Sequence, residues 1–433
     1  MNVSTKRQRI AELGKRFDQR SFTSLHHHLD LEWLTEAYQR LNTKSAPGAD
    51  GVTVEEYGKD LRSNLASLRE RVLGGEYQAP SVRRVWIPKG SGGNEKRPIG
   101  IPTTEDKVLQ RAVQMLLEPL YEPIFREVSY GFRPGRSPHM ALEAVWQAVT
   151  QMGGGWVLDV DVRKFFDTLD HEQLLTLLKH RVSDGVICRL IGKWLHAGVM
   201  EEDKVSYPQQ GTPQGGVISP LLSNVYLHYV LDEWFEEVVR PRLQGSARLI
   251  RFADDFVMVF RHQADAERVW QVLPLRFGKY GLQIHPDKTR LVDFRVPQDG
   301  GKSGTFTFLG FTHYWGQSRR GRRVVQRKTA RDRFTRSVRS IRQWCRAHCH
   351  ESLTEQHVQL TLKVRGHYLY YGLTGNIASL RRFHRQVTRC WQYWLNRRTR
   401  GRRLHWDRFV SRVLDNYPLP VPRLYHRYGT ASP

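Results

Sequence analysis

One stretch of the chain, residues 249–260, constrains the fold more than any other. It reads Leu-Ile-Arg-Phe-Ala-Asp-Asp-Phe-Val-Met-Val-Phe, with apolar residues on both sides of one acidic pair, Asp254 and Asp255. Two apolar runs that flank a short polar turn are typical of a β-hairpin. The pattern therefore predicts a hairpin with buried strands and a tight turn that carries both carboxylates.

A second acidic position stands in a predicted strand, residues 156–162. Its apolar residues alternate with Asp159 and Asp161, which is the period of two that a strand requires. A short aromatic connection follows, and Asp170 is placed to cap a helix, with Gln173 three residues later as a capping-box partner. We expect a strand, a connection and a helix, with Asp161 near the end of the strand.

The three aspartates Asp161, Asp254 and Asp255 predict a metal site when they are taken together. Alone, each is unremarkable, because Asp suits turns and exposed strand faces. Three crowded carboxylates would repel one another unless a cation lay between them. Magnesium prefers a few carboxylates together with phosphate oxygens and water, and two such ions about 3.5–4 Å apart serve nucleotidyl transfer in polymerases. The sequence thus indicates two bound Mg²⁺ ions.

The remaining pattern predicts a mixed fold in which strands give way to helices. No strand signal is apparent to us beyond residue 315, and three helices with apolar stripes follow. The predicted elements are a helix over 30–42, a β-hairpin over 83–102, helices over 105–120 and 265–280, strands over 288–294 and 306–311, and helices over 329–348, 355–371 and 377–398.

Positive charge is concentrated in the C-terminal third of the chain. Residues 302–433 hold 28 Lys and Arg against 5 Asp and Glu, which is 23 of the net charge of +25. Such a one-sided excess favours phosphate partners over an ordinary solvated surface. No apolar run reaches the roughly 20 residues of a membrane span, and we read no signal peptide. We therefore expect no membrane partner and a cytoplasmic location.

A set of ordered motifs resembles the group II intron-encoded reverse transcriptases. Phe252-Ala-Asp-Asp255 is similar to their aromatic-x-Asp-Asp box, and the match runs from about residue 30 to the tail. The other motifs are Ile87-Pro-Lys89 with Arg97-Pro-Ile-Gly-Ile-Pro102, Tyr130-Gly-Phe-Arg-Pro-Gly-Arg-Ser137, Val160-Asp-Val-Arg-Lys-Phe-Phe166-Asp167, Gln210-Gly-Thr-Pro-Gln-Gly-Gly-Val-Ile-Ser-Pro-Leu-Leu-Ser-Asn224, Phe308-Leu-Gly-Phe311 and Arg365-Gly-His-Tyr-Leu-Tyr-Tyr-Gly372.

The resemblance implies an α+β fold of the right-hand polymerase type. Residues 1–315 would form fingers and palm with an antiparallel sheet, preceded by an N-terminal helical extension. Residues 316–400 would form an all-α thumb, or maturase (X) domain, and residues 401–433 a short basic DNA-binding region. Many family members end in an HNH endonuclease; this chain resembles the form without one, which would need a primer from elsewhere.

The resemblance also implies a role for each matched residue. Asp161 and Asp254 would bind both metal ions, with Asp255 completing the cluster. Phe166 would be the steric gate that favours deoxynucleotides; a core aromatic is its alternative. The other nucleotide-binding residues would be Lys89, Arg97 and Gln214, with Lys96 as an alternative to Lys89. Lys288 would contact the nucleotide phosphate or the template, or is a simple surface lysine.

The implied partners are nucleic acids and their precursors. They are the group II intron RNA, the RNA template–DNA primer duplex, target DNA and dNTPs. The predicted helices over 329–348 and 377–398 would supply the contacts with phosphates. The residues concerned are Arg336, Arg339, Arg342, Arg346, Arg381, Arg382, Arg385 and Arg389.

Two other functions remain open at this point. The chain is either an RNA-directed DNA polymerase with a maturase role, an intron-like reverse transcriptase recruited to host defence or repair, or an RNA-binding splicing cofactor without polymerase activity. The three aspartates argue against the last. An RNA-dependent RNA polymerase is disfavoured by Phe166, whose ring would exclude a ribose 2′-hydroxyl.

Overall fold

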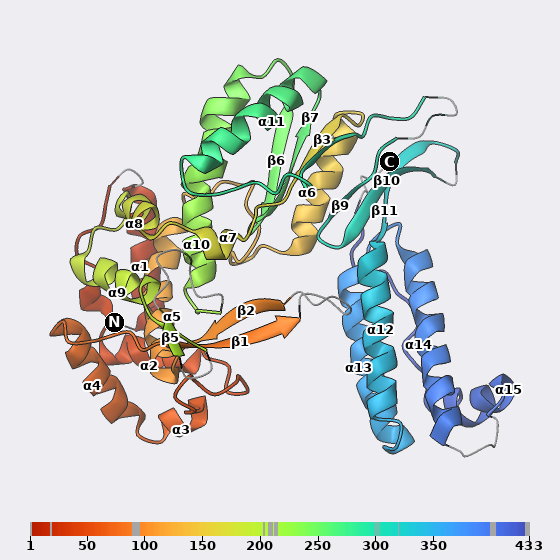
Figure 1. Cartoon of the computed structure of the whole chain (residues 1–433), viewed down its shortest axis with the longest axis horizontal. Helices are drawn as coiled ribbons and strands as arrows, with labels where there is room; N and C mark the ends of the chain where they lie inside the picture. Colours follow the sequence, from red (N-terminus) through yellow and green to blue (C-terminus); the bar gives the residue numbers. More distant parts are fainter. Residues whose placement is uncertain are drawn as a thin grey trace. The chain divides into compact units, whose positions relative to one another are not determined.

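In the computed structural model the chain forms two compact units, and Figure 1 labels its helices and strands. It describes residues 2–17, 20–88, 96–201, 204–206, 211, 215–298, 301, 303–318, 320–398 and 404–428. The first unit comprises the described residues of 2–88, 96–141 and 158–291, and the second those of 142–157 and 292–428.

The first unit begins with helices that pack around one long central helix, α5. The predicted helix over 105–120 is confirmed as α5 (Thr104–Tyr121), which is capped by the Thr103 hydroxyl. Trp33 of α2 is fully buried, and its ring nitrogen donates to the carbonyl oxygen of Ala112 in α5 at 3.0 Å. The surrounding helices are α1 (Val3–Arg16), α2 (Leu31–Gln39), α3 (Val54–Gly58), α4 (Leu61–Leu73), α8 (His171–Lys179) and α9 (Gly185–Leu195).

A four-stranded sheet in this unit contains the predicted β-hairpin over 83–102. Its strands are β1 (Val82–Pro88) and β2 (Lys96–Ile101), paired antiparallel with Ile87 opposite Arg97. The strand order is β2-β1-β4-β5, where β4 is Val199–Glu201 and β5 is Lys204–Ser206. The half of the hairpin that does not pair with β4, at the end of β1 and the start of β2, is exposed.

A second four-stranded sheet, in the order β6-β7-β3-β8, carries the predicted metal-binding residues. Because every residue of β7 after the first is buried, this strand forms the core of the sheet, and α11 packs against it. The strands are β3 (Trp156–Val160), β6 (Ala247–Phe252), β7 (Asp255–Phe260) and β8 (Arg290–Asp293). The helices of this part of the chain are α6 (Pro138–Gln151), α7 (Phe165–Thr168), α10 (Ser219–Leu227) and α11 (Gln263–Gly278). Helix α10 is continued by the π-helical turns His228–Asp232 and Trp234–Val239 and by a 3₁₀ turn, Arg240–Arg242.

The second unit contains strands that the sequence analysis did not predict. The expected single strand over 306–311 is wrong: β9 (Phe306–Phe308) turns at Leu309 and Gly310 into β10 (Phe311–Gln317). Both turn residues have positive φ, 47° and 79°, as the tight turns of β-hairpins require. The strand signal also continues beyond residue 315, because β11 (Arg323–Thr329) pairs antiparallel along the whole of β10.

Three helices complete the second unit and confirm the predicted helical region. They are α12 (Arg331–Ala347), α13 (Leu353–Tyr371) and α14 (Ile377–Arg398). Trp391 is fully buried in their core, and its ring nitrogen donates to Gln356 at 2.8 Å. After the short α15 (Trp406–Phe409) and a π-helical turn, Val410–Leu414, the chain returns to α13, where the Tyr425 amide donates to the Gly372 carbonyl oxygen at 2.7 Å.

The described helices include none that is both long and apolar enough to cross a membrane.

Candidate active site

Asp254 lies in the turn of the hairpin formed by β6 and β7. Phe252 pairs with Asp255, so the two turn residues are Ala253 and Asp254, and Asp255 is the first residue of β7. We predicted that the turn itself carries both aspartates. In the structure the turn lies one residue earlier in the chain and carries only Asp254. Ala253 adopts a left-handed conformation with φ of 58°, which is unfavourable for any residue with a Cβ atom. The hairpin thus presents Asp254 from a strained turn.

Asp161 directly follows β3, the strand that neighbours β7 in the sheet. Its backbone is held on both sides by the segment that precedes β8. The His285 amide donates to the Asp161 carbonyl oxygen at 2.8 Å, and the Asp161 amide donates to the Thr289 hydroxyl at 3.3 Å. The Lys288 ammonium lies 3.8 Å from an Asp161 carboxylate oxygen. The structure therefore fixes the backbone of Asp161 and leaves its side chain half-exposed.

Asp161 is close enough to Asp254 for its negative charge to affect the pKa of Asp254. Asp254 keeps some exposed surface but is densely surrounded by protein atoms, and this burial raises its pKa above the usual range. Hydrogen bonding to its own amide lowers the pKa, the negative charge of Asp161 raises it, and Arg251 lowers it. The ionised form of Asp254 is therefore disfavoured unless a further positive charge lies beside it.

This pair is a donor set that fits a divalent cation. Among the residues that the structure describes, no three His, Cys, Asp or Glu side chains are grouped so as to hold a metal ion. Magnesium sites in polymerases commonly use only one or two carboxylates together with substrate phosphates and water. Asp161 and Asp254 match that pattern, whereas Asp255 is exposed at the start of β7, and its part in a metal site stays a prediction.

Phe166 lies in the short connection that follows Asp161. Lys164 takes a left-handed conformation with φ of 46°, and the single helical turn α7 begins at Phe165. Phe165 is the buried member of the aromatic pair, and the half-exposed ring of Phe166 meets it edge-on, with 5.2 Å between ring centroids. Phe165 belongs to the core, whereas Phe166, five residues after Asp161, is only partly buried.

Of the predicted nucleotide-binding residues, Arg97 and its neighbour Lys96 lie on the β1–β2 hairpin. Arg97 is exposed on β2, opposite Ile87, and Lys96 beside it is also exposed. Lys89 and Gln214 lie outside the described residues, so the structure says nothing of their placement.

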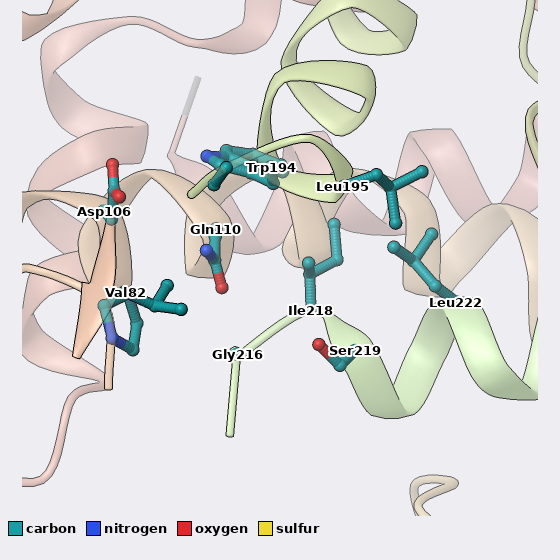
Figure 2. A pocket seen from close by; sticks show the side chains of 11 residues that line it. Val82, Asp106, Gln110, Trp194, Leu195, Gly216, Ile218, Ser219 and Leu222 are labelled. Carbon is teal, nitrogen blue, oxygen red and sulfur yellow. The ribbon is translucent and has the colours of Figure 1, made fainter. Parts of the chain in front are cut away.

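A small cavity lies behind the segment that follows Gln214. Its volume of about 20 Å³ admits roughly one water molecule, which is far too small for a nucleotide. Figure 2 shows Gln110 of α5 directed toward this segment, and its side-chain oxygen accepts from the Val217 amide at 2.8 Å. Asp106, which also lines the cavity, is buried and accepts from the Tyr77 hydroxyl; burial raises the pKa of Asp106 to about 7.

The sequence analysis missed a buried group of residues that holds the Asp254 turn. Arg251, two residues before Ala253, is fully buried and pairs with Asp232, which is also fully buried. It also contacts Asn224, the last residue of the predicted nucleotide-site motif. Arg251 stands three residues before Asp254 in the sequence, but no local sequence pattern indicated that its side chain is buried.

The predicted nucleic-acid contacts lie on two helices of the second unit. All are exposed except Arg336, which is half-buried. The guanidinium carbon of Arg382 on α14 lies 4.8 Å from the centroid of the Phe334 ring on α12. Arg382 therefore contacts the apolar residues between these two helices. The exposed residues are Arg339, Arg342 and Arg346 on α12, and Arg381, Arg382, Arg385 and Arg389 on α14.

Comparison with known families and proteins identifies the family of this chain. Residues 87–313, more than half of the chain, match the family model described as reverse transcriptase (RNA-dependent DNA polymerase). That range includes Arg97, Asp161, Phe166 and both aspartates of the β6–β7 hairpin.

Named relatives are also similar to this chain. Protein YkfC of Escherichia coli (strain K12) is 36% identical over 331 residues, which cover 68% of this chain and 84% of that protein. The group II intron-encoded protein LtrA of Lactococcus lactis subsp. cremoris is 35% identical over 225 residues, 51% of this chain and only 37% of LtrA. Nuclear intron maturase 4, mitochondrial, of Arabidopsis thaliana is 27% identical over 151 residues, 35% of this chain and 19% of that protein.

Proposed function

The chain belongs to the reverse transcriptase family of RNA-directed DNA polymerases, and from this membership we propose that it is the reverse transcriptase and maturase of a group II intron. Enzymes of this family use divalent metal ions. The predicted α+β right-hand polymerase class agrees with the family and with the mixed sheets and helices of the structure.

The observation that carries the proposal is the pairing of Asp161 with Asp254. Asp161 follows β3 and Asp254 lies in the turn before β7, the neighbouring strand; burial and, to a smaller extent, the negative charge of Asp161 raise the pKa of Asp254, so a bound cation would favour the ionised carboxylate. We propose that the two aspartates bind two Mg²⁺ ions, with Asp255 completing the cluster. The ions would supply activation of the primer 3′-hydroxyl and neutralisation of the developing charge on the phosphates.

The remaining residues of the site would select and orient the nucleotide. The half-exposed ring of Phe166 would occupy the space of a ribose 2′-hydroxyl and so favour dNTPs. The guanidinium of Arg97 suits bidentate binding of a phosphate, and Lys89 and Gln214 would complete the nucleotide site. Lys288, 3.8 Å from Asp161, is placed to meet a nucleotide phosphate once metal ions neutralise the aspartate.

The second unit would hold nucleic acid by its phosphates. Exposed arginines on α12 and α14 would contact the template–primer duplex and the intron RNA without reading sequence. In domain terms, we propose fingers and palm within 1–315, a thumb or maturase domain within 316–400, and target-DNA contacts within 401–433. Such a protein would act in the bacterial cytoplasm, where its RNA and DNA partners meet.

Primer extension on an RNA template tests the polymerase proposal. We expect the protein to extend a DNA primer with dNTPs and Mg²⁺, and Asp254→Ala to abolish extension. Asp60→Ala is the matched control, because Asp60 is exposed and its side chain makes no capping hydrogen bond. Absence of extension by the unmodified protein would favour a splicing cofactor without polymerase activity.

Copurifying RNA tests the maturase proposal separately. We expect ribozyme-like intron RNA to be enriched with the protein and its splicing to be accelerated, with Asp254→Ala retaining both effects. Robust primer extension without an associated intron RNA would instead favour a reverse transcriptase recruited to host defence or repair.

A further inference from the structure

Arg251 is a buried cation that the proposed chemistry does not yet use. It lies on β6, with its side chain fully buried. Its Nε donates to one carboxylate oxygen of Asp232 at 2.8 Å, and one terminal nitrogen donates to the other at 2.5 Å. Asp232, also fully buried, ends a π-helical turn that continues α10. π-Type turns are frequent at functional sites, and here the turn places a carboxylate opposite Arg251.

The second terminal nitrogen of Arg251 reaches the catalytic turn itself. It donates to the carbonyl oxygen of Ala253 at 2.9 Å and to the side-chain oxygen of Asn224 at 3.0 Å. The amide nitrogen of Asn224 in turn donates to the Gly131 carbonyl oxygen at 2.7 Å. The guanidinium therefore connects the strained residue before Asp254 with α10 and with the segment at Gly131.

The backbone of Arg251 is held as firmly as its side chain. Its amide donates to the Val128 carbonyl oxygen, and its own carbonyl oxygen accepts from the Tyr130 amide, both at 2.8 Å. A left-handed alanine persists only where its surroundings over-determine it. At Ala253, the hydrogen bond from Arg251 to the carbonyl oxygen supplies that constraint. No ammonium group could reproduce it, because a lysine lacks the planar fork that binds three partners at fixed angles.

We propose that Arg251 is a positioning residue for metal binding: anchored by Asp232 and Asn224, it fixes the turn at Ala253 so that Asp254 faces Asp161 around a divalent cation. This inference rests on the proposed polymerase function and deepens it. Arg251 touches neither substrate nor metal, and its effect passes through the backbone of the turn.

Direct binding of Mn²⁺, followed by electron paramagnetic resonance without nucleotide or primer, tests the proposal. In Arg251→Lys we expect the affinity for Mn²⁺ to fall at least about tenfold, as it does when residues that orient metal ligands are replaced. Asn224→Ala, which removes one anchor and keeps the ion pair, should show a smaller loss. If Arg251→Lys does not fold, Asn224→Ala carries the test alone.

The control separates positioning from simple stabilisation. Arg181 is also buried, at 1% exposure, and donates to the carbonyl oxygens of Gly14 and Arg20, which lie outside the turn at Ala253 and Asp254. Arg181→Lys should lower the melting temperature and leave Mn²⁺ affinity unchanged. Unchanged Mn²⁺ affinity in folded Arg251→Lys or Asn224→Ala would overturn the proposal, as would the absence of Mn²⁺ binding by the unmodified protein. Binding that responds as expected in a protein that does not extend primers would support the inference while refuting the polymerase proposal.

Discussion

The backbone of Gly131 lies so close to that of Ala253 that a Cβ atom at position 131 would overlap the Ala253 amide nitrogen. We therefore expect Gly131→Ala to displace the turn that carries Asp254. A displacement of about 1 Å at reacting groups costs on the order of 100-fold in rate. Single-nucleotide primer extension under saturating dNTP should show this loss in kcat, with primer–template affinity retained.

A second glycine in the same unit provides the control. A Cβ atom at Gly278, the last residue of α11, would meet nothing within 4 Å. Gly278→Ala should therefore retain full activity. Normal kcat in a folded Gly131→Ala protein would show that the turn tolerates displacement, and the close approach would then have no catalytic meaning.

Phe166→Ala should weaken the discrimination against ribonucleotides. The half-exposed ring of Phe166 is proposed to exclude a 2′-hydroxyl, so its removal opens space for one. We expect the ratio of kcat/KM for dNTP over rNTP to fall at least about tenfold, since steric differences in a pocket are worth roughly 1–3 kcal/mol. Competition between dCTP and CTP in primer extension measures this ratio.

The neighbouring aromatic residue serves as the reference for Phe166. Phe165 is only 2% exposed and belongs to the core. Phe165→Leu should lower the melting temperature and leave the sugar selectivity intact. If Phe166→Ala behaves in the same way, Phe166 is a core aromatic and the gate lies elsewhere.

Local patterns were sufficient to predict the elements that carry the candidate site. The hairpin of β6 and β7 was predicted because its strands are apolar runs around a polar turn. The exact position of the turn was not predicted from the sequence, because Ala253 has no intrinsic preference for a left-handed conformation. That conformation depends on Arg251, which acts from outside the turn.

Long-range contacts explain what the sequence could not predict. The ion pair of Arg251 and Asp232 joins positions 19 residues apart, on a strand and a helical turn, and no local period encodes it. Strand β11 was missed because its basic residues conceal the alternation. Arg327 is only 2% exposed there, with its guanidinium 5.9 Å from the Trp146 ring and 4.7 Å from the Tyr428 ring.

Arg381→Ala combined with Arg385→Ala should weaken binding of an RNA–DNA duplex in a salt-dependent manner. Both residues are exposed on α14. Each lost phosphate contact removes somewhat less than one released counterion, so the slope of log K against log [salt] should become shallower by roughly 1 to 2. Fluorescence anisotropy across a series of KCl concentrations gives that slope.

An exposed arginine pair on the first unit controls for net charge. Arg62→Ala with Arg69→Ala on α4 removes the same two charges from another surface. The salt slope of this control should stay within about 0.5 of the unmodified value, since neither Arg62 nor Arg69 is among the residues proposed to contact phosphates. Equal changes in both double variants would mean that only total charge matters, and α14 would lose its special role.

Asp106 should make the protein less stable as the pH rises toward 8. Burial raises its pKa to about 7 in the folded state, whereas an unfolded Asp titrates near 3.8. The protonated form is thus favoured by folding, and this stabilisation is complete below about pH 4 and lost as the pH rises through 7. Asp106→Asn stays neutral and can still accept from Tyr77, so it should escape the loss.

The measurement is thermal unfolding of both proteins at pH 5 and pH 8. Between these values the unmodified protein should lose roughly 2–3 kcal/mol relative to Asp106→Asn. The advantage of the variant in melting temperature should therefore grow by about 2–3 °C. A constant difference at the two pH values would mean that Asp106 does not titrate in this window.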